Sequence, residues 1–456
     1  MVSSATLLSS TSSFSQTGTS IFLPIVQKGY DSNHSIFLPI VQKGYDSNQV
    51  LPFGVQIGDL RDSPHIDLAQ SVGAGWVRTG LSWASLEPNN VTPENFNWSA
   101  YDPGLAAIAQ ANLQPLINIT DNPAWAATTS CGPINSEYLQ DYASFLQAVV
   151  ARYSKAPYNV HYWEIYNEPD NTTPYRIWLG GCWGFKGKQY ADMLRVAYPV
   201  IKAADPQAQV VLGSLAYDWF TKDGGPFDER FIDDVVDPAA GNGGAYFDIL
   251  AFHYYTVFAN VWDRYGTDVM GKTNYLRSKL ASYGVTKPMI VTEISQWSKS
   301  SDGSGSDAQQ SAYVVQSFAR TLAAGLRFSI WYNLVDYSDI GYGLFNADFS
   351  HKPSYTAYQV VNRRMSGASY VGPLQIGGIR PNHIEGYTFT MPDQRQRYIL
   401  WATVDGTVKV AFPGNGAVVT NSAGVATTVT DSADGALDGV VNLSVTNSPV
   451  YVDISS

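Results

Sequence analysis

The chain has 456 residues, of which 45% are hydrophobic and 15% are charged, so it can bury a large core and is long enough for more than one domain. Its net charge of −11 argues against nucleic acid or an anionic membrane as a partner, because both require a basic surface. The 12 tryptophans and 29 tyrosines suit a carbohydrate partner, since flat apolar rings can stack on sugar rings.

The chain begins with residues 1–20, which contain no lysine or arginine and lack the basic start and apolar centre of a secretory signal. A signal that had been removed and replaced by a start methionine would leave such a segment, and we expect a secreted or cell-surface protein. No stretch approaches the roughly 20 apolar residues that span a bilayer. The six histidines show no metal-ligand spacing, so no metal and no other cofactor is expected.

A duplicated segment follows: residues 20–33 (SIFLPIVQKGYDSN) recur unchanged as residues 35–48. Two copies of so short a unit are too few for a solenoid. The sequence allows two interpretations of residues 1–50. They form an extended, poorly ordered leader, or they supply a strand or attachment element that docks on the folded body.

From residue 51 to residue 366, apolar strand-like segments alternate with helix-like segments. The predicted strands are Phe53–Ile57, Gly75–Thr79, Gln114–Ile119, Val160–Ile165, Gln209–Gly213, Phe247–Phe252, Pro288–Thr292 and Phe328–Asn333. The clearest predicted helices are Tyr138–Tyr153, Gln189–Ala204, Thr273–Tyr283, Asp307–Ala324 and Tyr355–Met365. Such alternation indicates a parallel sheet covered on both faces. Eight units predict a (β/α)8 barrel, in which the active site forms at the C-terminal strand ends.

Residues 367–456 are rich in Gly, Thr, Val, Asn and Asp, and their apolar residues alternate in short runs. The predicted strands are Gly386–Met391, Tyr398–Val404, Thr407–Phe412, Ala417–Thr420, Val440–Thr446 and Val450–Ile454. Short strands separated by turn residues are typical of an antiparallel β-sandwich.

The only cysteines are Cys131 and Cys182, both in loop-like surroundings. A disulfide between them would close a loop of about 51 residues and contribute roughly 4 kcal/mol in the chain-entropy model. Two cysteines alone leave both the bonded and the free state open.

Two of the predicted strands lead into a glutamate at the barrel rim. Glu168 follows the fourth strand in the run WEIYNEPD, and Glu293 ends the seventh in the run PMIVTE. Cleaving a glycosidic bond requires such a pair, because one carboxyl group protonates the leaving oxygen while the other meets the positive charge that develops on the sugar. We therefore expect the two side chains to converge.

The alternation along the fourth strand predicts that Glu164, Tyr166 and Glu168 point inward, with Glu164 deepest. An unpaired Glu164 would cost several kcal/mol in desolvation. Arg78, at the end of the second strand, is the natural cationic partner. We therefore interpret Glu164 as half of a core ion pair rather than as a catalytic group.

The motif Asn167-Glu168-Pro169 after the fourth strand, with Glu293 after the seventh, resembles the retaining glycoside hydrolases of clan A, most closely family 39 and its exopolysaccharide-cleaving relatives. The resemblance covers the barrel and the C-terminal sandwich. It implies that Glu168 is the general acid/base and Glu293 the nucleophile of a double displacement. The carboxyl groups should then lie about 5–5.5 Å apart.

The resemblance also implies roles for neighbouring residues. Asn167 would bind the 2-hydroxyl of the sugar, and Arg78 would keep the nucleophile ionised. Tyr255 would hydrogen-bond the nucleophile, and His253 would contact the acid/base. Trp331 would form the floor under the cleaved sugar. For His253, Tyr255 and Trp331 the alternative is simple core packing.

Tryptophans in the loops above the predicted barrel are candidate platforms for sugar stacking. Trp83 and Trp125 follow the second and third strands, and Trp178, Trp183 and Trp297 are further candidates. The alternative is that they anchor their loops.

The sequence therefore predicts a retaining β-glycoside hydrolase, most simply an endo-acting enzyme on a neutral polysaccharide. An exo-acting, β-xylosidase-like enzyme is the second interpretation. A non-catalytic carbohydrate-binding protein would have lost one of the two glutamates, and both are present. A purely structural surface protein is the remaining alternative, suggested by the leader and the sandwich.

Overall fold

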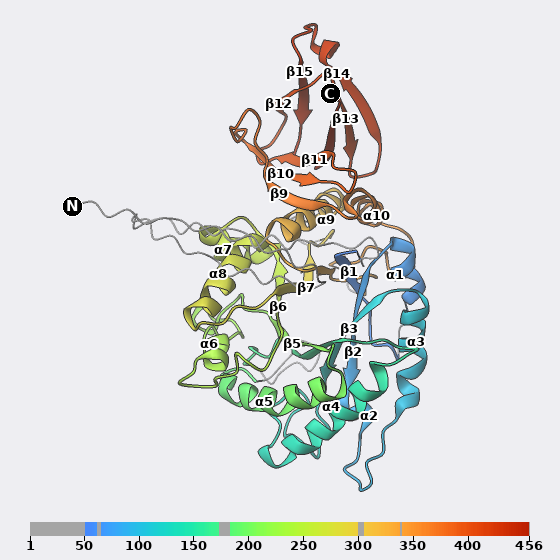
Figure 1. Ribbon diagram of the computed structural model, residues 1–456, viewed down its shortest axis with the longest axis vertical. Coiled ribbons are helices and arrows are strands. Elements are labelled where there is room, and N and C mark those ends of the chain that lie inside the picture. Colours follow the sequence, from blue (N-terminus) through green and yellow to red (C-terminus); the bar gives the residue numbers. More distant parts are fainter. Residues whose placement is uncertain (1–50, 62–64, 173–182, 300–304, 338–339, 456) are drawn as a thin grey trace, which may run out of the picture. The chain divides into compact units, whose positions relative to one another are not determined.

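Eight parallel strands form a closed barrel in chain order, with β8 hydrogen-bonded to β1 (Figure 1). The computed structural model describes residues 51–455 except 62–64, 173–182, 300–304 and 338–339. The strands are β1 Phe53–Gln56, β2 Trp76–Ser82, β3 Gln114–Thr120, β4 Tyr162–Asn167, β5 Gln209–Leu215, β6 Ile249–Tyr255, β7 Met289–Ser295 and β8 Ser329–Trp331. Each overlaps a predicted strand, so the predicted barrel is confirmed.

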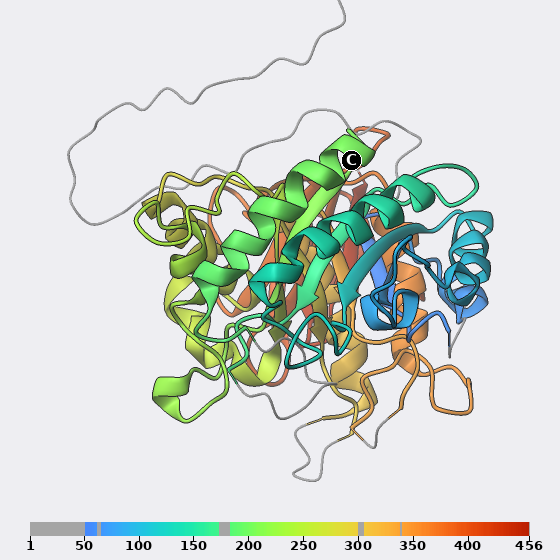
Figure 2. The ribbon, with the colours of Figure 1, turned by 90° about the horizontal axis from the view of Figure 1, so that it is seen from below.

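Helices form a ring around these strands (Figure 1). They are α1 Ile66–Val72, α2 Trp83–Leu86, α3 Asp102–Gln110, α4 Leu139–Tyr153, α5 Gly187–Ala204, α6 Phe231–Val236, α7 Ala259–Trp262, α8 Val269–Ser282, α9 Asp307–Ala323 and α10 Pro353–Met365. The long helices α4 and α5 lie side by side on the outside of the barrel (Figure 2). The sequence predicted α4, α5, α8, α9 and α10. It missed the shorter helices, which show too few turns for a clear period.

The half of the barrel interior near the N-terminal ends of the strands is a packed apolar core. Its buried residues are Trp76, Leu116, Val211, Ile249, Ala251, Ile290, Phe328 and Ile330. The rings of Trp76 and Phe328 stack with centroids 3.9 Å apart. The opposite faces of the strands pack against the helices. The barrel is therefore filled at its N-terminal end, and polar inward-facing side chains gather toward the C-terminal strand ends.

The C-terminal region consists of antiparallel sheets, as predicted. A six-stranded sheet has the order β14-β13-β16-β11-β10-β9, and β12 pairs with β15. The strands are β9 Ser369–Pro373, β10 Ile384–Thr390, β11 Gln396–Ala402, β12 Val408–Pro413, β13 Gly416–Asn421, β14 Ala426–Thr430, β15 Val440–Val445 and β16 Val450–Ser455. Leu400, Phe412, Leu443 and Val452 belong to its core. The sequence missed β9 and β14, which contain no fully buried residue and show no apolar alternation.

The barrel helices and the C-terminal sheet are joined by a buried cation, and both belong to one compact unit of the chain. Arg320 of α9 makes two 2.8 Å hydrogen bonds to Glu385 of β10 and an ion pair of 3.2 Å to Asp268, which precedes α8. The Arg320 guanidinium also lies 5.2 Å from the ring of Trp401. No helix in the described part of the chain has the length and apolar character to cross a membrane. The duplicated segment lies outside the described residues.

Candidate active site

Glu168 is placed by an irregular backbone at the end of β4. Tyr166 and Glu168 have φ values of +65° and +45°, a region that non-glycine residues seldom adopt. The Tyr166 ring consequently packs against Tyr142 and Trp183 in the helix layer, so the prediction that it points inward was wrong. The backbone nitrogen of Glu168 donates to the carbonyl oxygen of Ser214, 2.8 Å away. The turn thus ties the end of β4 to β5.

The Glu168 carboxyl group lies in a nearly closed site, with its side chain 14% exposed. Its Oε1 is 3.0 Å from Nδ1 of His253. Burial raises the pKa of Glu168 well above its ordinary value, and the negative charges of Glu293 and Asp170 raise it further. The group is thus suited to hold a proton.

Glu293 of β7 faces two hydrogen-bond donors. Its Oε1 accepts from Nη1 of Arg78 at 2.9 Å, and its Oε2 accepts from the Tyr255 hydroxyl at 2.5 Å. Burial raises the pKa of Glu293, but the Arg78 charge and these two hydrogen bonds oppose that effect. Of the two carboxyl groups, Glu293 therefore loses its proton more readily.

Arg78 connects the predicted site residues to one another. The residue is 2% exposed, and its Nε donates to Oε2 of Glu164 at 2.6 Å while its Nη2 donates to Oδ1 of Asn167 at 2.5 Å. Glu164 is fully buried and also accepts from Nδ2 of Asn118 at 3.0 Å. One cation is thus shared between Glu164 and Glu293, and its geometry also fixes Asn167.

His253 touches both members of the carboxyl pair. Besides its contact with Glu168, its Nε2 lies 3.5 Å from Oε1 of Glu293. Burial lowers the pKa of this 1%-exposed imidazole well below its ordinary value, and the charges of Arg78 and Lys272 lower it further. The ring is therefore neutral. The two glutamates lie on either side of a single imidazole and so converge on one site.

Trp331 does not fit the predicted floor of a sugar site. It is completely buried, its Nε1 donates to the carbonyl oxygen of Tyr342 at 3.0 Å, and its ring lies 6.3 Å from Tyr313 of α9. Its side chain belongs to the layer between barrel and helices. The next residue, Tyr332, is half-buried, with its ring 6.1 Å from that of Tyr255 and 5.7 Å from that of Tyr342. The aromatic side chain beside Tyr255 is thus Tyr332, one position after the predicted Trp331.

The candidate tryptophan platforms differ in exposure. Trp83 and Trp183 are 1% and 2% exposed, which leaves no ring face for a sugar, so both pack in the core. Trp125 is half-buried beside Trp83, with ring centroids 5.3 Å apart. Trp297 is half-buried and lies near Tyr342. Trp178 is outside the described residues.

Trp219, after β5, is 52% exposed, although its neighbours in the sequence do not single it out. It sits between buried neighbours in the run AYDWF, where no pattern reveals which ring faces outward. Its position in the loop after β5 was the only available signal.

The cysteine prediction is tested only at one partner. Cys131 is disulfide-bonded, whereas Cys182 lies outside the described residues. Cys182 is the only other cysteine of the chain. Because it is not among the described residues, its pairing with Cys131 stays a prediction. Within the described ranges, no group of three His, Cys, Asp or Glu side chains is arranged to hold a metal ion.

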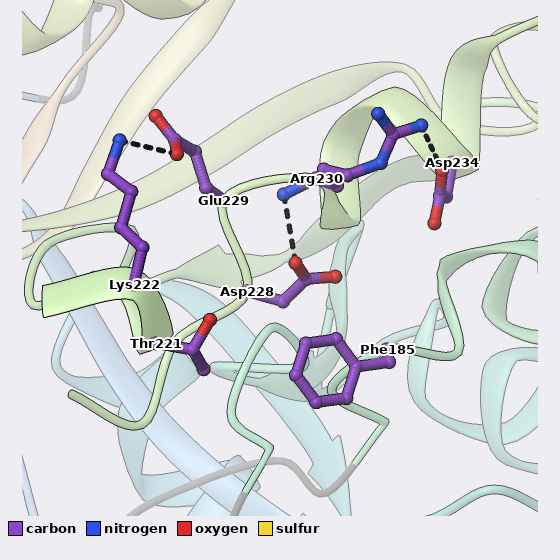
Figure 3. A pocket seen from close by; sticks show the side chains of 7 residues that line it. All are labelled: Phe185, Thr221, Lys222, Asp228, Glu229, Arg230 and Asp234. Carbon is purple, nitrogen blue, oxygen red and sulfur yellow. Dashed lines mark hydrogen bonds and ion pairs between the residues drawn. The ribbon is translucent and has the colours of Figure 1, made fainter. Parts of the chain in front are cut away.

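A separate cavity of about 400 Å³ lies among the loops that follow β4 and β5 (Figure 3). Its lining residues are Phe185, Thr221, Lys222, Asp228, Glu229, Arg230 and Asp234. Its cations are paired: Lys222 lies 2.6 Å from Glu229, and Arg230 lies 3.4 Å from Asp234. The cavity contains neither catalytic candidate.

Solved structures similar to this one include several glycoside hydrolases. A family 39 glycoside hydrolase from the gut symbiont Bacteroides cellulosilyticus WH2 is 20% identical with a TM-score of 0.66, and the match covers 91% of this chain and 83% of that one. A family 30 endoxylanase from Clostridium papyrosolvens C71 is 12% identical with a TM-score of 0.59, covering 91% and 99%. The endo-beta1,6-glucanase BT3312 is 13% identical with a TM-score of 0.59, covering 91% and 93%. At these identities the likeness concerns the fold.

Sequence comparison adds a family. No match was found among curated protein sequences. Residues 43–334, more than half of the chain, match the family Cellulase (glycosyl hydrolase family 5). The chain therefore belongs to this family, which confirms the resemblance to clan A and makes the protein a glycoside hydrolase.

Proposed function

We propose that this glycoside hydrolase cleaves β-linked sugars with net retention, using Glu168 as general acid/base and Glu293 as nucleophile. The main support is the unequal pair of carboxyl groups around one imidazole. Glu293 accepts hydrogen bonds from the Arg78 guanidinium and the Tyr255 hydroxyl, whereas the pKa of Glu168 is raised further than that of Glu293. One group is thus suited to attack and the other to donate a proton.

In the first step, an oxygen of Glu293 forms a bond to the anomeric carbon as the bond from that carbon to the leaving oxygen breaks. Glu168 gives its proton to that oxygen. Arg78 and Tyr255 hold the attacking carboxylate in position through both of its oxygens. The result is a glycosyl ester on Glu293 and an ionised Glu168.

In the second step, Glu168 takes a proton from water, and the water oxygen displaces Glu293 from the anomeric carbon. Ester formation has removed the negative charge of Glu293, which helped to raise the pKa of Glu168. The pKa of Glu168 therefore falls in the intermediate, and the former acid becomes a base.

His253 fits both steps as a neutral positioning residue. Before attack, its Nδ1 can accept from protonated Glu168, and its Nε2–H then lies near ionised Glu293, 3.5 Å from Oε1, without a hydrogen bond to it. After attack, the other neutral tautomer, with its hydrogen on Nδ1 instead of Nε2, can donate a hydrogen bond to ionised Glu168. The choice of tautomer is our inference from these two distances and the low pKa of the ring.

In this proposal Asn167, Tyr332 and Tyr342 lie on the glycone side, where the sugar that becomes bound to Glu293 is held. Arg78 occupies Oδ1 of Asn167, which leaves the amide NH2 to donate to a 2-hydroxyl. Tyr332 and Tyr342 stand beside Tyr255, the partner of the nucleophile. These rings can contact the sugar that becomes bound to Glu293.

We propose a neutral polysaccharide as substrate and internal cleavage as the mode. The net charge of −11 disfavours polyanionic chains. Two structurally similar proteins are described as an endoxylanase and an endo-beta1,6-glucanase. A polysaccharide is too large to enter a cell, so such an enzyme would act outside it.

Aryl β-glycosides with a good leaving group test the roles of the two glutamates. Glu293→Ala should abolish turnover, and azide should restore it with an α-glycosyl azide as product. Glu168→Ala should still form the glycosyl-enzyme from activated substrates and should yield a β-glycosyl azide. Azide products of the opposite configurations would reverse the assignment, and full activity of either variant would refute it.

A further inference from the structure

A buried ion pair that the proposed reaction does not use joins the two ends of the segment between β8 and α10. Lys352 and Asp336 are 3% and 6% exposed, and Nζ of Lys352 lies 3.3 Å from Oδ2 of Asp336. Burial lowers the pKa of Lys352, and the charge of Asp336 opposes that effect. A buried ion pair recovers little of its desolvation cost, so stability alone is a weak reason for its presence.

The lysine of this pair helps to fix one peptide group of the segment, through the carbonyl oxygen of Gly341. That oxygen accepts from Nζ of Lys352 at 3.0 Å and from Nε2 of Gln310, a completely buried residue of α9, at 2.9 Å. It also accepts from the backbone nitrogen of Ser298, which follows β7, at 2.9 Å. Three donors from separate parts of the chain therefore hold a single carbonyl group.

The aspartate of the pair holds the chain on the other side of Tyr342. The backbone nitrogen of Gly343 donates to Oδ1 of Asp336 at 2.5 Å. A Cβ atom on Gly343 would lie 2.4 Å from the backbone nitrogen of Asp336, so this close approach requires a residue without a side chain. The two members of the ion pair thus fix the neighbours of Tyr342 in the chain.

The ring of Tyr342 lies beside the side chain that binds the nucleophile. Its centroid is 6.0 Å from that of Tyr255, whose hydroxyl donates to Oε2 of Glu293 at 2.5 Å. The negative charge of Glu293 adds to burial in raising the pKa of Tyr342, so this phenol lies within the field of the carboxylate. The position of the Tyr342 ring therefore limits where the Tyr255 ring and its hydroxyl can lie.

We infer that Lys352 is a positioning residue of the reaction. Together with Asp336 it holds the Tyr342 ring in place, and that ring keeps the Tyr255 hydroxyl directed at Glu293. The inference rests on the proposed function and goes beyond it, because it assigns a task to a lysine outside the carboxyl pair and its direct partners. Loss of Lys352 would release the carbonyl group of Gly341 and weaken the hydrogen bond to the nucleophile.

The acid limb of the kcat/KM profile reports on this hydrogen bond. The substrate is 2,4-dinitrophenyl β-cellobioside or β-xylobioside, whose leaving group departs without a proton, so the acid limb follows ionisation of Glu293. The hydrogen bond from Tyr255 lowers the pKa of Glu293, so weakening it should raise this pKa and move the limb to higher pH. The other titratable or charged groups near Glu293 stay in place: Arg78 on β2, Glu164 on β4, Glu168 after β4, His253 on β6, and Tyr337 and Tyr342 after β8.

Lys352→Met removes the donor to Gly341 and keeps an apolar side chain. It should lower kcat/KM per folded molecule roughly 10- to 100-fold and move the acid limb to higher pH, as Tyr255→Phe should. Because Lys352→Met leaves Asp336 without its nearest cation, a variant that also carries Asp336→Asn is measured beside it. The asparagine oxygen can still accept from Gly343, so this variant contains no unpaired buried charge and should show the same two changes.

Lys279→Met is a matched control for the loss of a buried lysine. Lys279 of α8 pairs with Asp233 of α6 at 2.7 Å, and the two side chains are 16% and 14% exposed. This substitution should lower stability and leave both kcat/KM per folded molecule and the acid limb unchanged. An acid limb that moved equally in Lys279→Met would overturn the inference, because the limb would then report stability alone.

A double-mutant cycle tests whether Lys352 acts through Tyr255. In the Tyr255→Phe background, Lys352→Met should lower kcat/KM less than about threefold, because the hydrogen bond that it positions is already absent. Equal losses in both backgrounds, or a wild-type acid limb in Lys352→Met, would overturn the inference and leave the ion pair a purely structural role. Failure of the proposed function would appear separately, as full activity of Glu293→Ala on the same substrate, and the inference would fall with it.

Discussion

The two ends of the barrel interior are built on the same eight strands and have opposite chemistry. On β2, Trp76 lies in the apolar core, and Arg78, two positions later, binds two carboxylates. On β4, Tyr162 packs against that core, whereas Glu164 is a buried anion. A single step along the inward-facing side of a strand therefore separates a hydrophobic core from an ionic site.

The difference shows what each end contributes. Burying a large apolar side chain stabilises a fold by roughly 1.5–3 kcal/mol, whereas a buried ion costs several kcal/mol unless it is paired. The apolar end thus supplies stability that offsets the cost of Arg78, Glu164 and Glu293 at the rim. Substitutions at the two ends should therefore separate loss of stability from loss of activity.

Arg78→Leu should have the largest effect. It removes the partner of Glu164 and Glu293 together, and breaking a buried pair costs about 3–5 kcal/mol. Lost charge-assisted hydrogen bonds should also lower kcat/KM roughly 10²- to 10⁴-fold. Urea unfolding and steady-state kinetics measure the two losses. Wild-type stability in Arg78→Leu would mean that Glu164 does not depend on this cation.

Tyr255→Phe should impair catalysis with little effect on folding. The hydroxyl donates to Oε2 of Glu293, and a hydrogen bond to a charged group is worth about 1.5–3 kcal/mol, or roughly 10- to 100-fold in kcat/KM. The loss should appear in turnover of an aryl glycoside, while the thermal unfolding midpoint changes little. An equal loss of stability and activity would indicate a packing role instead.

Ile330→Val is the matched change at the apolar end. It removes one buried methylene group and should lower the free energy of unfolding by about 0.5–1.5 kcal/mol. The value of kcat/KM per folded molecule should stay at the wild-type level. A marked fall in kcat/KM would mean that the apolar core also positions the catalytic groups.

Among the site residues, Asp170→Asn should give the smallest change in activity, visible in the pH profile. Its NH2 group cannot accept from one of the backbone nitrogens of Ala216 and Tyr217, so the substitution should also cost about 1–3 kcal/mol of stability. Burial raises the pKa of Asp170 to about 7, so its charge is present mainly above that pH. That charge opposes ionisation of Glu168, and removing it should lower the pKa of Glu168. The alkaline limb of the kcat/KM profile, where the acid loses its proton, should therefore move to lower pH. A limb that stays in place or moves upward would contradict this coupling.

The sequence was informative where periodic patterns control the structure. Apolar runs placed all eight barrel strands, and the cost of an unpaired Glu164 pointed to Arg78, which the structure places beside it. Glu168 and Glu293 could be predicted as a convergent pair because parallel strands end at a common rim.

The remaining features depend on local backbone geometry and on exposure. The positive φ of Tyr166 reverses the direction that alternation predicts. The irregular end of β8 turns Tyr332, rather than Trp331, toward the site. The burial of Trp83 depends on Trp125, Tyr142 and Phe145, which are distant in sequence, and no single-sequence pattern reveals it.

The buried Arg320 has a consequence for attempts to shorten the chain. An enzyme that ended at Met365 would keep Asp268 beside this guanidinium but lose Glu385 and the indole of Trp401. Arg320 would then keep one of its two carboxylate partners, and a helix surface that the sheet now covers would be exposed to water. The C-terminal strands thus cover part of the helix layer of the catalytic barrel. Their removal should promote aggregation before it lowers catalytic activity.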